Sequence, residues 1–303
     1  MTGETGGGSG PQPGSGGDGG DARRKHGSNT ISDVLRLSTE YLAARGSETP
    51  RLDAERLLAK ALGLERIDLY MALDRPLMPP ELDSARALVV RRGAREPLQY
   101  VLGEWGFRHL TLNVDPRALI PRPETEVLVE RALVLLEGRD APRVLDVGTG
   151  SGAVALAIRD EHPGALVTGF DFSVDALALA AENAARTGLE IDLVRGDLFA
   201  GLPPGPWDLI VSNPPYVDAS EIPTLQPEVR DWEPHEALTA EGAVAAVARG
   251  AVPVMAPGAG IVLEIGIGQA GATAALLGEI GLVEIRVTPD LREIDRIVEG
   301  RLA

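Results

Sequence analysis

The chain contains no cysteine, few aromatic residues and fewer basic than acidic residues. Without cysteine it has no disulfide, no thiolate metal ligand and no cysteine nucleophile. Lys and Arg account for 29 of the 303 residues and Asp and Glu for 45, which gives a formal net charge of −16. Such a chain lacks the basic surface that usually binds a phosphate backbone, so no direct binding of nucleic acid is expected.

Long apolar stretches are also missing from the chain. There is no run of about 18 apolar residues, so no transmembrane helix is expected. The N-terminus lacks a basic region followed by an apolar segment, so no secretory signal is expected. With no cysteine, the simplest prediction is a cytoplasmic protein without a membrane partner. No metal site is expected, because metal-ligand spacing is absent and the histidines are scattered at positions 26, 109, 162 and 235.

Composition and periodicity divide the chain into four parts. Residues 1–29 are rich in Gly, Ser and Pro and predict a disordered tail. Apolar residues at helical spacing predict a small helical domain over 30–96, which suits a docking module, a lid or a stabilising extension. Alternating apolar residues predict a β-hairpin linker over 97–122. Repeated strands and helices over 123–303 predict an α/β domain with a doubly wound, mostly parallel sheet.

A glycine loop follows the first strand of this last domain. Val144–Val147 is a short apolar strand, and Gly148-Thr149-Gly150-Ser151-Gly152 leads from it into a helix. Glycines let the backbone approach a ligand closely, and the N-terminus of a helix favours an anionic group. Asp171 follows about 20 residues later at the end of the next strand, where a carboxylate accepts hydrogen bonds from ribose hydroxyls. This combination predicts an adenosine-type ligand.

Two cofactors could supply that adenosine group. The spacing Gly-x-Gly-x-Gly departs from the Gly-x-Gly-x-x-Gly fingerprint of dinucleotide-binding proteins, so S-adenosylmethionine fits better than NAD. Asp197, near the end of the third strand, could accept a hydrogen bond from the adenine amine, and Leu198 would pack on the ring. The alternative for Asp197 is an ordinary turn residue.

A second motif follows the fourth strand, Leu209 to Val211, and reads Asn213-Pro214-Pro215-Tyr216. The prolines end the strand and keep Asn213 out of the helical region. Asn213 therefore lies at a stiff corner at the carboxyl end of the strand, where open α/β sheets bind ligands. The Asn213 and Pro214 carbonyls and the Tyr216 ring suit a planar NH2 group, such as an amide or a base amine. An ordinary turn is the alternative.

These motifs are accompanied by others in a fixed order. They are Pro97-Leu-Gln-Tyr100, Pro121-Arg-Pro-Glu-Thr-Glu126, Leu145 to Gly152, Ser212 to Val217, Trp232-Glu-Pro234 and Glu264-Ile-Gly-Ile-Gly-Gln269. The combination resembles the PrmC/HemK family of glutamine methyltransferases, which modify peptide chain release factors. The Asn-Pro-Pro-Tyr motif is shared with DNA adenine methyltransferases, whereas the Pro121–Glu126 motif is the most specific.

The resemblance implies a Rossmann-like class I methyltransferase domain, a helical domain that docks the substrate, and S-adenosyl-L-methionine as cofactor. The residues it implies for cofactor binding are Gly148, Thr149, Gly150, Ser151, Gly152, Asp171, Asp197, Leu198 and Asn213. Those it implies for the substrate are Asn213, Pro214, Pro215 and Tyr216, of which Asn213, Pro214 and Tyr216 are the predicted catalytic groups. The substrate would be the glutamine in the Gly-Gly-Gln motif of a release factor.

Several alternatives stay open at the level of sequence. The same architecture serves glutamine methylation of a ribosomal protein. DNA adenine methylation is disfavoured by the acidic charge, and an inert binding protein is disfavoured by the intact motifs. Some family members have an aromatic residue where Leu198 stands, which weakens stacking on adenine here. Arg122 and Glu126 either line the mouth of the site or brace the hairpin.

Overall fold

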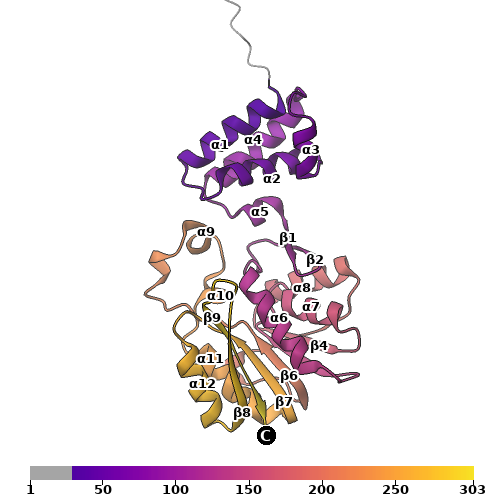
Figure 1. Cartoon of the computed structure of the whole chain (residues 1–303), viewed down its shortest axis with the longest axis vertical. Helices are drawn as coiled ribbons and strands as arrows, with labels where there is room; N and C mark the ends of the chain where they lie inside the picture. The colour runs from indigo at the N-terminus through magenta and orange to yellow at the C-terminus, as the bar shows by residue number, and fades with distance from the viewer. Residues whose placement is uncertain (1–28) are drawn as a thin grey trace, which may run out of the picture.

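The computed structural model describes residues 29–303, so the expected disordered tail lies outside the described residues except for Asn29. The first part of the chain is helical (Figure 1). Its helices are α1 (Ile31–Ala44), α2 (Pro50–Leu62), α3 (Arg66–Met71), α4 (Pro79–Gly93) and α5 (Leu98–Leu102). They share one apolar core that is separate from the core of the sheet domain.

The helix ends follow the capping signals in the sequence. The Thr30 side chain accepts a hydrogen bond from the Asp33 amide and caps α1, and Gly63 ends α2 in the left-handed conformation. The prediction for 97–103 was wrong, because these residues form α5 rather than a strand. Pro97 and Gly103 bound this helix, and Leu98 and Val101 complete the helical core. Their burial outweighs a short alternating pattern.

The predicted hairpin is present but shorter than 97–122. It consists of β1 (Glu104–Phe107) and β2 (Leu110–Asn113), which pair in antiparallel fashion. Phe107 and Leu112 are buried in the core of the sheet domain, beside α6 (Pro123–Leu136). The hairpin therefore anchors the connection between the helical bundle and the sheet, as Figure 1 shows.

The second part of the chain is built on a seven-stranded sheet with the order β5-β4-β3-β6-β7-β9-β8. Its strands are β3 (Arg143–Val147), β4 (Leu166–Asp171), β5 (Asp192–Arg195), β6 (Trp207–Ser212), β7 (Met255–Glu264), β8 (Leu282–Pro289) and β9 (Asp295–Leu302). Only β9 runs against its neighbours β7 and β8 within this sheet. The predicted α/β class and the mostly parallel sheet are confirmed, and this strand order is that of class I methyltransferases.

Helices cover both faces of the sheet. Val144 and Leu145 are consecutive in β3 and point to opposite faces, into two separate cores. One core contains residues of α6 and α7 (Ala153–Glu161) with the partly buried Ala184 of α8 (Val174–Thr187). The other contains α11 (Ala243–Ala251) and α12 (Ala270–Glu279). In the described part of the chain, no helix is long and apolar enough to cross a membrane.

The direction in which strands are added to the sheet reverses between β3 and β6. These two strands are parallel neighbours, and Val147 pairs with Ser212 at their carboxyl ends. The Ser212 hydroxyl donates a hydrogen bond of 2.7 Å to the Val147 carbonyl. The glycine loop and the Asn-Pro-Pro-Tyr corner therefore begin side by side, at the point where open α/β sheets bind ligands.

Candidate active site

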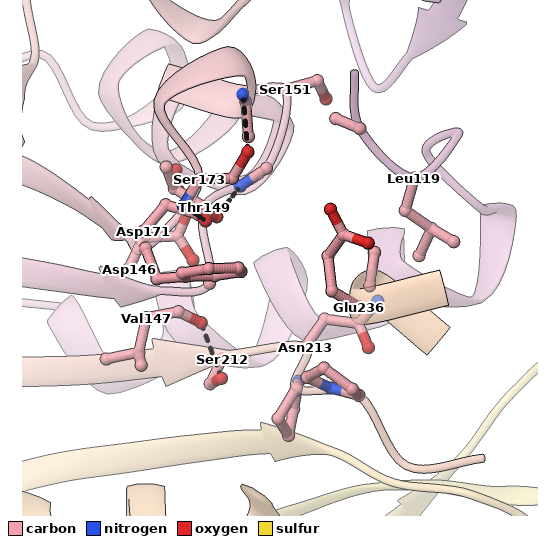
Figure 2. A pocket seen from close by; sticks show the side chains of 18 of the residues that line it. Leu119, Asp146, Val147, Thr149, Ser151, Asp171, Ser173, Ser212, Asn213 and Glu236 are labelled. Atoms are coloured by element: carbon pink, nitrogen blue, oxygen red, sulfur yellow. Dashed lines mark hydrogen bonds between the residues drawn. The ribbon is translucent and has the colours of Figure 1, made fainter. Parts of the chain in front are cut away.

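A cavity of about 370 Å³ lies at the carboxyl ends of β3, β4 and β6. Figure 2 shows Asp146 and Asp171 on the side of the strands, with Leu119 and Glu236 across from them. Most of the predicted site residues line this cavity: Gly148, Thr149, Gly150, Ser151, Asp171, Asp197, Leu198, Asn213, Pro214 and Pro215. The cavity lining does not include Gly152 or Tyr216.

The backbone of the glycine loop has positive φ angles at Gly148, Gly150 and Gly152, of 75°, 56° and 81°. Side chains rarely adopt this conformation, so glycine is required there. Gly152 supports the loop from behind, because a Cβ atom at this position would lie 3.2 Å from the Cβ of Ala180. Its role is therefore to let the loop pack against α8.

The side chain of Asp146, in β3, holds the glycine loop by hydrogen bonds. One carboxylate oxygen accepts hydrogen bonds from the Thr149 hydroxyl at 2.7 Å and from the Ala155 amide at 3.2 Å. Burial raises the pKa of Asp146 to about 7, although these two hydrogen bonds act in the opposite direction. Asp146 thus ties the loop to the first turn of α7.

Asp171 ends β4 and points to the cavity with both carboxylate oxygens held. One oxygen accepts the Gly150 amide and the other the Ser173 amide, each at 2.9 Å. Burial raises the pKa of this carboxyl group. Each oxygen of a carboxylate has a second lone pair, so a pair of ligand hydroxyls can still be bound. Ser173 caps α8 as predicted, because its side chain accepts from the Ala176 amide.

The far end of the cavity is lined by the residues that follow β4 and β5. Asp197 faces the cavity, and its carboxylate also accepts the Phe199 amide at 2.9 Å, so it is a turn residue and a pocket residue at once. Sequence reasoning missed two aromatic rings here, Phe172 and Phe199, whose exposed fractions are 54% and 60%. Each of these rings directly follows a predicted cofactor residue, Phe172 after Asp171 and Phe199 after Leu198, and this position in the sequence could have identified them.

The corner after β6 places Asn213 beside the glycine loop. The Asn213 side-chain nitrogen donates a hydrogen bond of 3.1 Å to the Thr125 hydroxyl. This bond orients the amide and leaves the Oδ1 atom as the acceptor on the side of the cavity. Pro214 is buried, and its carbonyl precedes Pro215, which has no N–H to donate.

Tyr216 turns away from this cavity. Its hydroxyl donates to Oε1 of Glu264 at 3.2 Å, and its backbone carbonyl accepts from the side chain of Gln269, also at 3.2 Å. These contacts hold the end of the Asn-Pro-Pro-Tyr motif against the segment after β7. The predicted stacking of the Tyr216 ring on a substrate amide stays a prediction.

The structure separates the two roles that the sequence left open for Arg122 and Glu126. Arg122 lines the cavity and forms an ion pair with the buried Glu233. Glu126 accepts the Arg108 amide at 3.1 Å and so braces the hairpin. Leu119 and Glu236 also line the cavity and were missed, because each comes from a connection with no sequence pattern of its own.

Comparisons with known proteins agree with this geometry. Residues 33–103 match the model of the PrmC N-terminal domain, and residues 124–256 match that of the methyltransferase small domain. The release factor glutamine methyltransferase of Geobacter sulfurreducens is 44% identical over 90% of this chain and 97% of its own. The chain belongs to the family of release factor glutamine methyltransferases.

Further relatives extend the comparison in sequence and in fold. The family member from Deinococcus radiodurans is 42% identical over 90% of this chain and 99% of its own. A 16S rRNA methyltransferase of T. thermophilus, solved with AdoMet and guanosine, shares the fold with a TM-score of 0.50. It is 20% identical, and the match covers 66% of this chain and 50% of that one.

Proposed function

We propose that this protein transfers the methyl group of S-adenosyl-L-methionine to the side-chain amide nitrogen of a glutamine in peptide chain release factors, the one in their Gly-Gly-Gln motif. The observation that carries the proposal is the orientation of Asn213. Its nitrogen is held by Thr125, which leaves a carbonyl acceptor at the cavity, beside the loop expected to hold the cofactor. The family to which the chain belongs has this activity in its name.

The residues around the cavity fit S-adenosyl-L-methionine. Asp171 would accept hydrogen bonds from the ribose hydroxyls, and the backbone of Gly148–Gly152 would lie against the cofactor. Asp197 would accept from the adenine amine, while Leu198 and the exposed Phe172 and Phe199 rings would flank the base. When bound, the cofactor supplies an electrophilic methyl group on a sulfonium centre.

The Asn-Pro-Pro corner would position the substrate amide. An amide nitrogen is a poor nucleophile, because its lone pair is delocalised into the carbonyl group. The Oδ1 atom of Asn213 and the Pro214 carbonyl would each accept one N–H, which aims the lone pair of that nitrogen at the methyl group. The same acceptors stabilise the positive charge that develops on the nitrogen, so positioning and electrostatics provide the catalysis. Tyr216 would support the corner, and water would take the released proton.

The helical part of the chain would dock the release factor. The sequence predicts docking by 30–96, a linker over 97–122 and catalysis by 123–303. Because helix α5 packs in the helical core, we move the limit between the docking part and the linker to Gly103. Release factors act on ribosomes, so we place the reaction in the cytoplasm.

The test incubates the protein with methyl-labelled S-adenosylmethionine and purified release factor, either wild type or with the Gly-Gly-Gln glutamine replaced. Label on the wild-type factor alone is the expected result. Label on neither factor, together with label on ribosomal proteins, would contradict the proposed substrate and favour a ribosomal glutamine. Thermal stabilisation by S-adenosylhomocysteine but not by NADH is the expected result of a separate cofactor test.

A further inference from the structure

A buried carboxyl group lies behind the Asn-Pro-Pro-Tyr corner. Glu264 ends β7, and the preceding Leu263 pairs with Ser212, the last residue of β6, so Glu264 lies near the point where Asn213 leaves the sheet. Its exposed fraction is 1%. The cavity lining does not include it, so it does not touch a ligand there.

Two hydroxyl groups act on the Glu264 carboxylate, one from Tyr216 of the corner and one from Thr125 of α6. The Tyr216 hydroxyl donates to Oε1 at 3.2 Å. The Thr125 hydroxyl is near enough to act on the carboxylate as well, and it lowers the pKa of Glu264. Oε2 makes no close hydrogen bond to any of residues 29–303, so it keeps lone pairs toward which the Thr125 hydrogen can turn. Burial raises the pKa of Glu264 to about 7, and these hydroxyls lower it.

The hydroxyl of Thr125 also contacts Asn213. Its oxygen accepts the Asn213 side-chain nitrogen at 3.1 Å, so its own hydrogen must point elsewhere. The unpartnered Oε2 atom of Glu264 is the acceptor that would take this hydrogen. Donation would then run from the Asn213 NH2 group to Thr125, and from Thr125 to Glu264. An asparagine flipped by 180° would present its oxygen to the Thr125 oxygen, and while the Thr125 hydrogen points to Glu264 no hydrogen lies between these two oxygens.

We propose that Glu264 is a positioning residue, which fixes the amide of Asn213 through Thr125 and the end of the corner through Tyr216. In the fixed orientation, Oδ1 of Asn213 faces the substrate as an acceptor. In the flipped orientation an NH2 group would face the NH2 group of the substrate, and the acceptor would be lost. This inference rests on the proposed function, because it assigns Asn213 the task of accepting from an amide.

The first test replaces Thr125 by Val, which has the same shape but neither accepts nor donates. Thr125→Val should lower kcat for release factor methylation by roughly 10-fold or more, the effect of losing one oriented hydrogen bond. The KM for the release factor and the affinity for S-adenosylhomocysteine should stay close to wild type. Thr125→Ser should restore most of kcat. The control is Thr187→Val, since the Thr187 hydroxyl bonds only carbonyls of its own helix α8.

The second test changes the carboxylate itself. Glu264→Gln keeps one acceptor oxygen and should be less impaired in kcat than Glu264→Leu, which keeps none. Thr125→Val with wild-type kcat would overturn the proposal. So would an equal loss of kcat, cofactor affinity and thermal stability, because that result describes a merely structural residue.

A third readout does not depend on activity. The side-chain NH2 signal of Asn213, assigned by its absence in Asn213→Ala, should exchange slowly with solvent in the wild-type protein. It should exchange faster in Thr125→Val and in Glu264→Leu. If the exchange rates match the wild type, the positioning role is wrong. A wild-type protein that shows slow exchange but no methylation of release factors would instead contradict the proposed substrate alone.

Discussion

Asn213 carries a donor and an acceptor on one planar group, and the structure assigns them to opposite sides. The NH2 group is held by Thr125, a buried residue of the cavity wall, and the carbonyl oxygen is left to accept from a ligand in the cavity. An alanine at this position would remove the substrate acceptor while leaving the glycine loop and Asp171 in place. A substitution of Asn213 should therefore lower the rate of methyl transfer while leaving the binding of the cofactor nearly unchanged.

We expect Asn213→Ala to lower the rate of methyl transfer by about 100-fold or more, as does the loss of an oriented group at a developing charge. The affinity for S-adenosylhomocysteine should change by no more than a few-fold, measured by calorimetry. Asn113→Ala is a matched control, because that side chain accepts only from the exposed Arg186. A variant at Asn213 that keeps the wild-type rate would contradict the role given to its oxygen.

Asp146 should make the stability of the protein depend on pH. Its pKa in the folded state is about 7, above the ordinary value of 3.8. The folded state then binds this proton more tightly than the unfolded state, so the contribution of Asp146 to stability falls as pH rises through that interval. Above about pH 7 the buried group is ionised in both states and the loss is complete.

Asp146→Asn should remove this dependence. The bonds from Thr149 and Ala155 reach the same carboxylate oxygen, and the asparagine oxygen can accept both. The unfolding free energy of the variant minus that of the wild type should grow with pH and level off above about pH 7. Urea unfolding at several pH values measures it. Asp146 is not among the groups that shift the pKa of Glu264, so the effect of Glu264 should cancel in this difference. A difference that stays constant with pH would argue against an elevated pKa.

The glycine loop is the element through which the backbone meets the cofactor. Gly150 has a φ of 56°, and its amide donates to Asp171. Gly188 has a φ of 69° at the far end of α8, where an added Cβ would meet no atom within 4 Å. An alanine should strain the backbone by about 1 kcal/mol at either position. The two glycines thus have the same conformation, but only Gly150 lies at the cavity.

Gly150→Ala and Gly188→Ala should therefore lose similar stability, by roughly 1 kcal/mol in chemical unfolding. Only Gly150→Ala should also weaken the binding of S-adenosylhomocysteine, because the added methyl group lies at the cavity and shifts the amide that holds Asp171. Calorimetric titration of both variants measures the difference. Equal affinities in the two variants would mean that the glycine loop does not contact the cofactor.

The sequence alone predicts those features that depend on residues close together in the chain. Asn213 and Asp171 each follow an apolar strand, so the sequence alone predicts their place at one edge of the sheet. Thr125 and Glu264 were not assigned a role, because their contacts join elements far apart in the chain. Helix α5 was mistaken for a strand because its apolar residues alternate over only a few positions, and burial in the helical core decided its conformation.

At the scale of the whole molecule, an ion-pair network joins the helical bundle to the methyltransferase domain. Arg92 of α4 is buried and bonds Asp53 of α2 and Glu228 of α9 (Pro227–Arg230), each at 2.8 Å. Arg95 bonds the other oxygen of Glu228 at 2.5 Å. Glu228 lies on the connection that follows Asn-Pro-Pro-Tyr, so the network fixes the bundle relative to the corner.

Weakening this ion-pair network should raise the KM for the release factor, with little effect on kcat. Glu228→Gln keeps one acceptor but removes the charge that both arginines share, so the bundle should be held less firmly. We expect the KM for the release factor to rise by about 5- to 10-fold, equivalent to roughly 1 kcal/mol, with kcat nearly unchanged. Glu221→Gln, at an exposed position of the same connection, is the control and should keep the wild-type KM. Steady-state kinetics with full-length release factor measure both constants. A fall in kcat at constant KM would mean that the network acts on the catalytic corner itself rather than on docking.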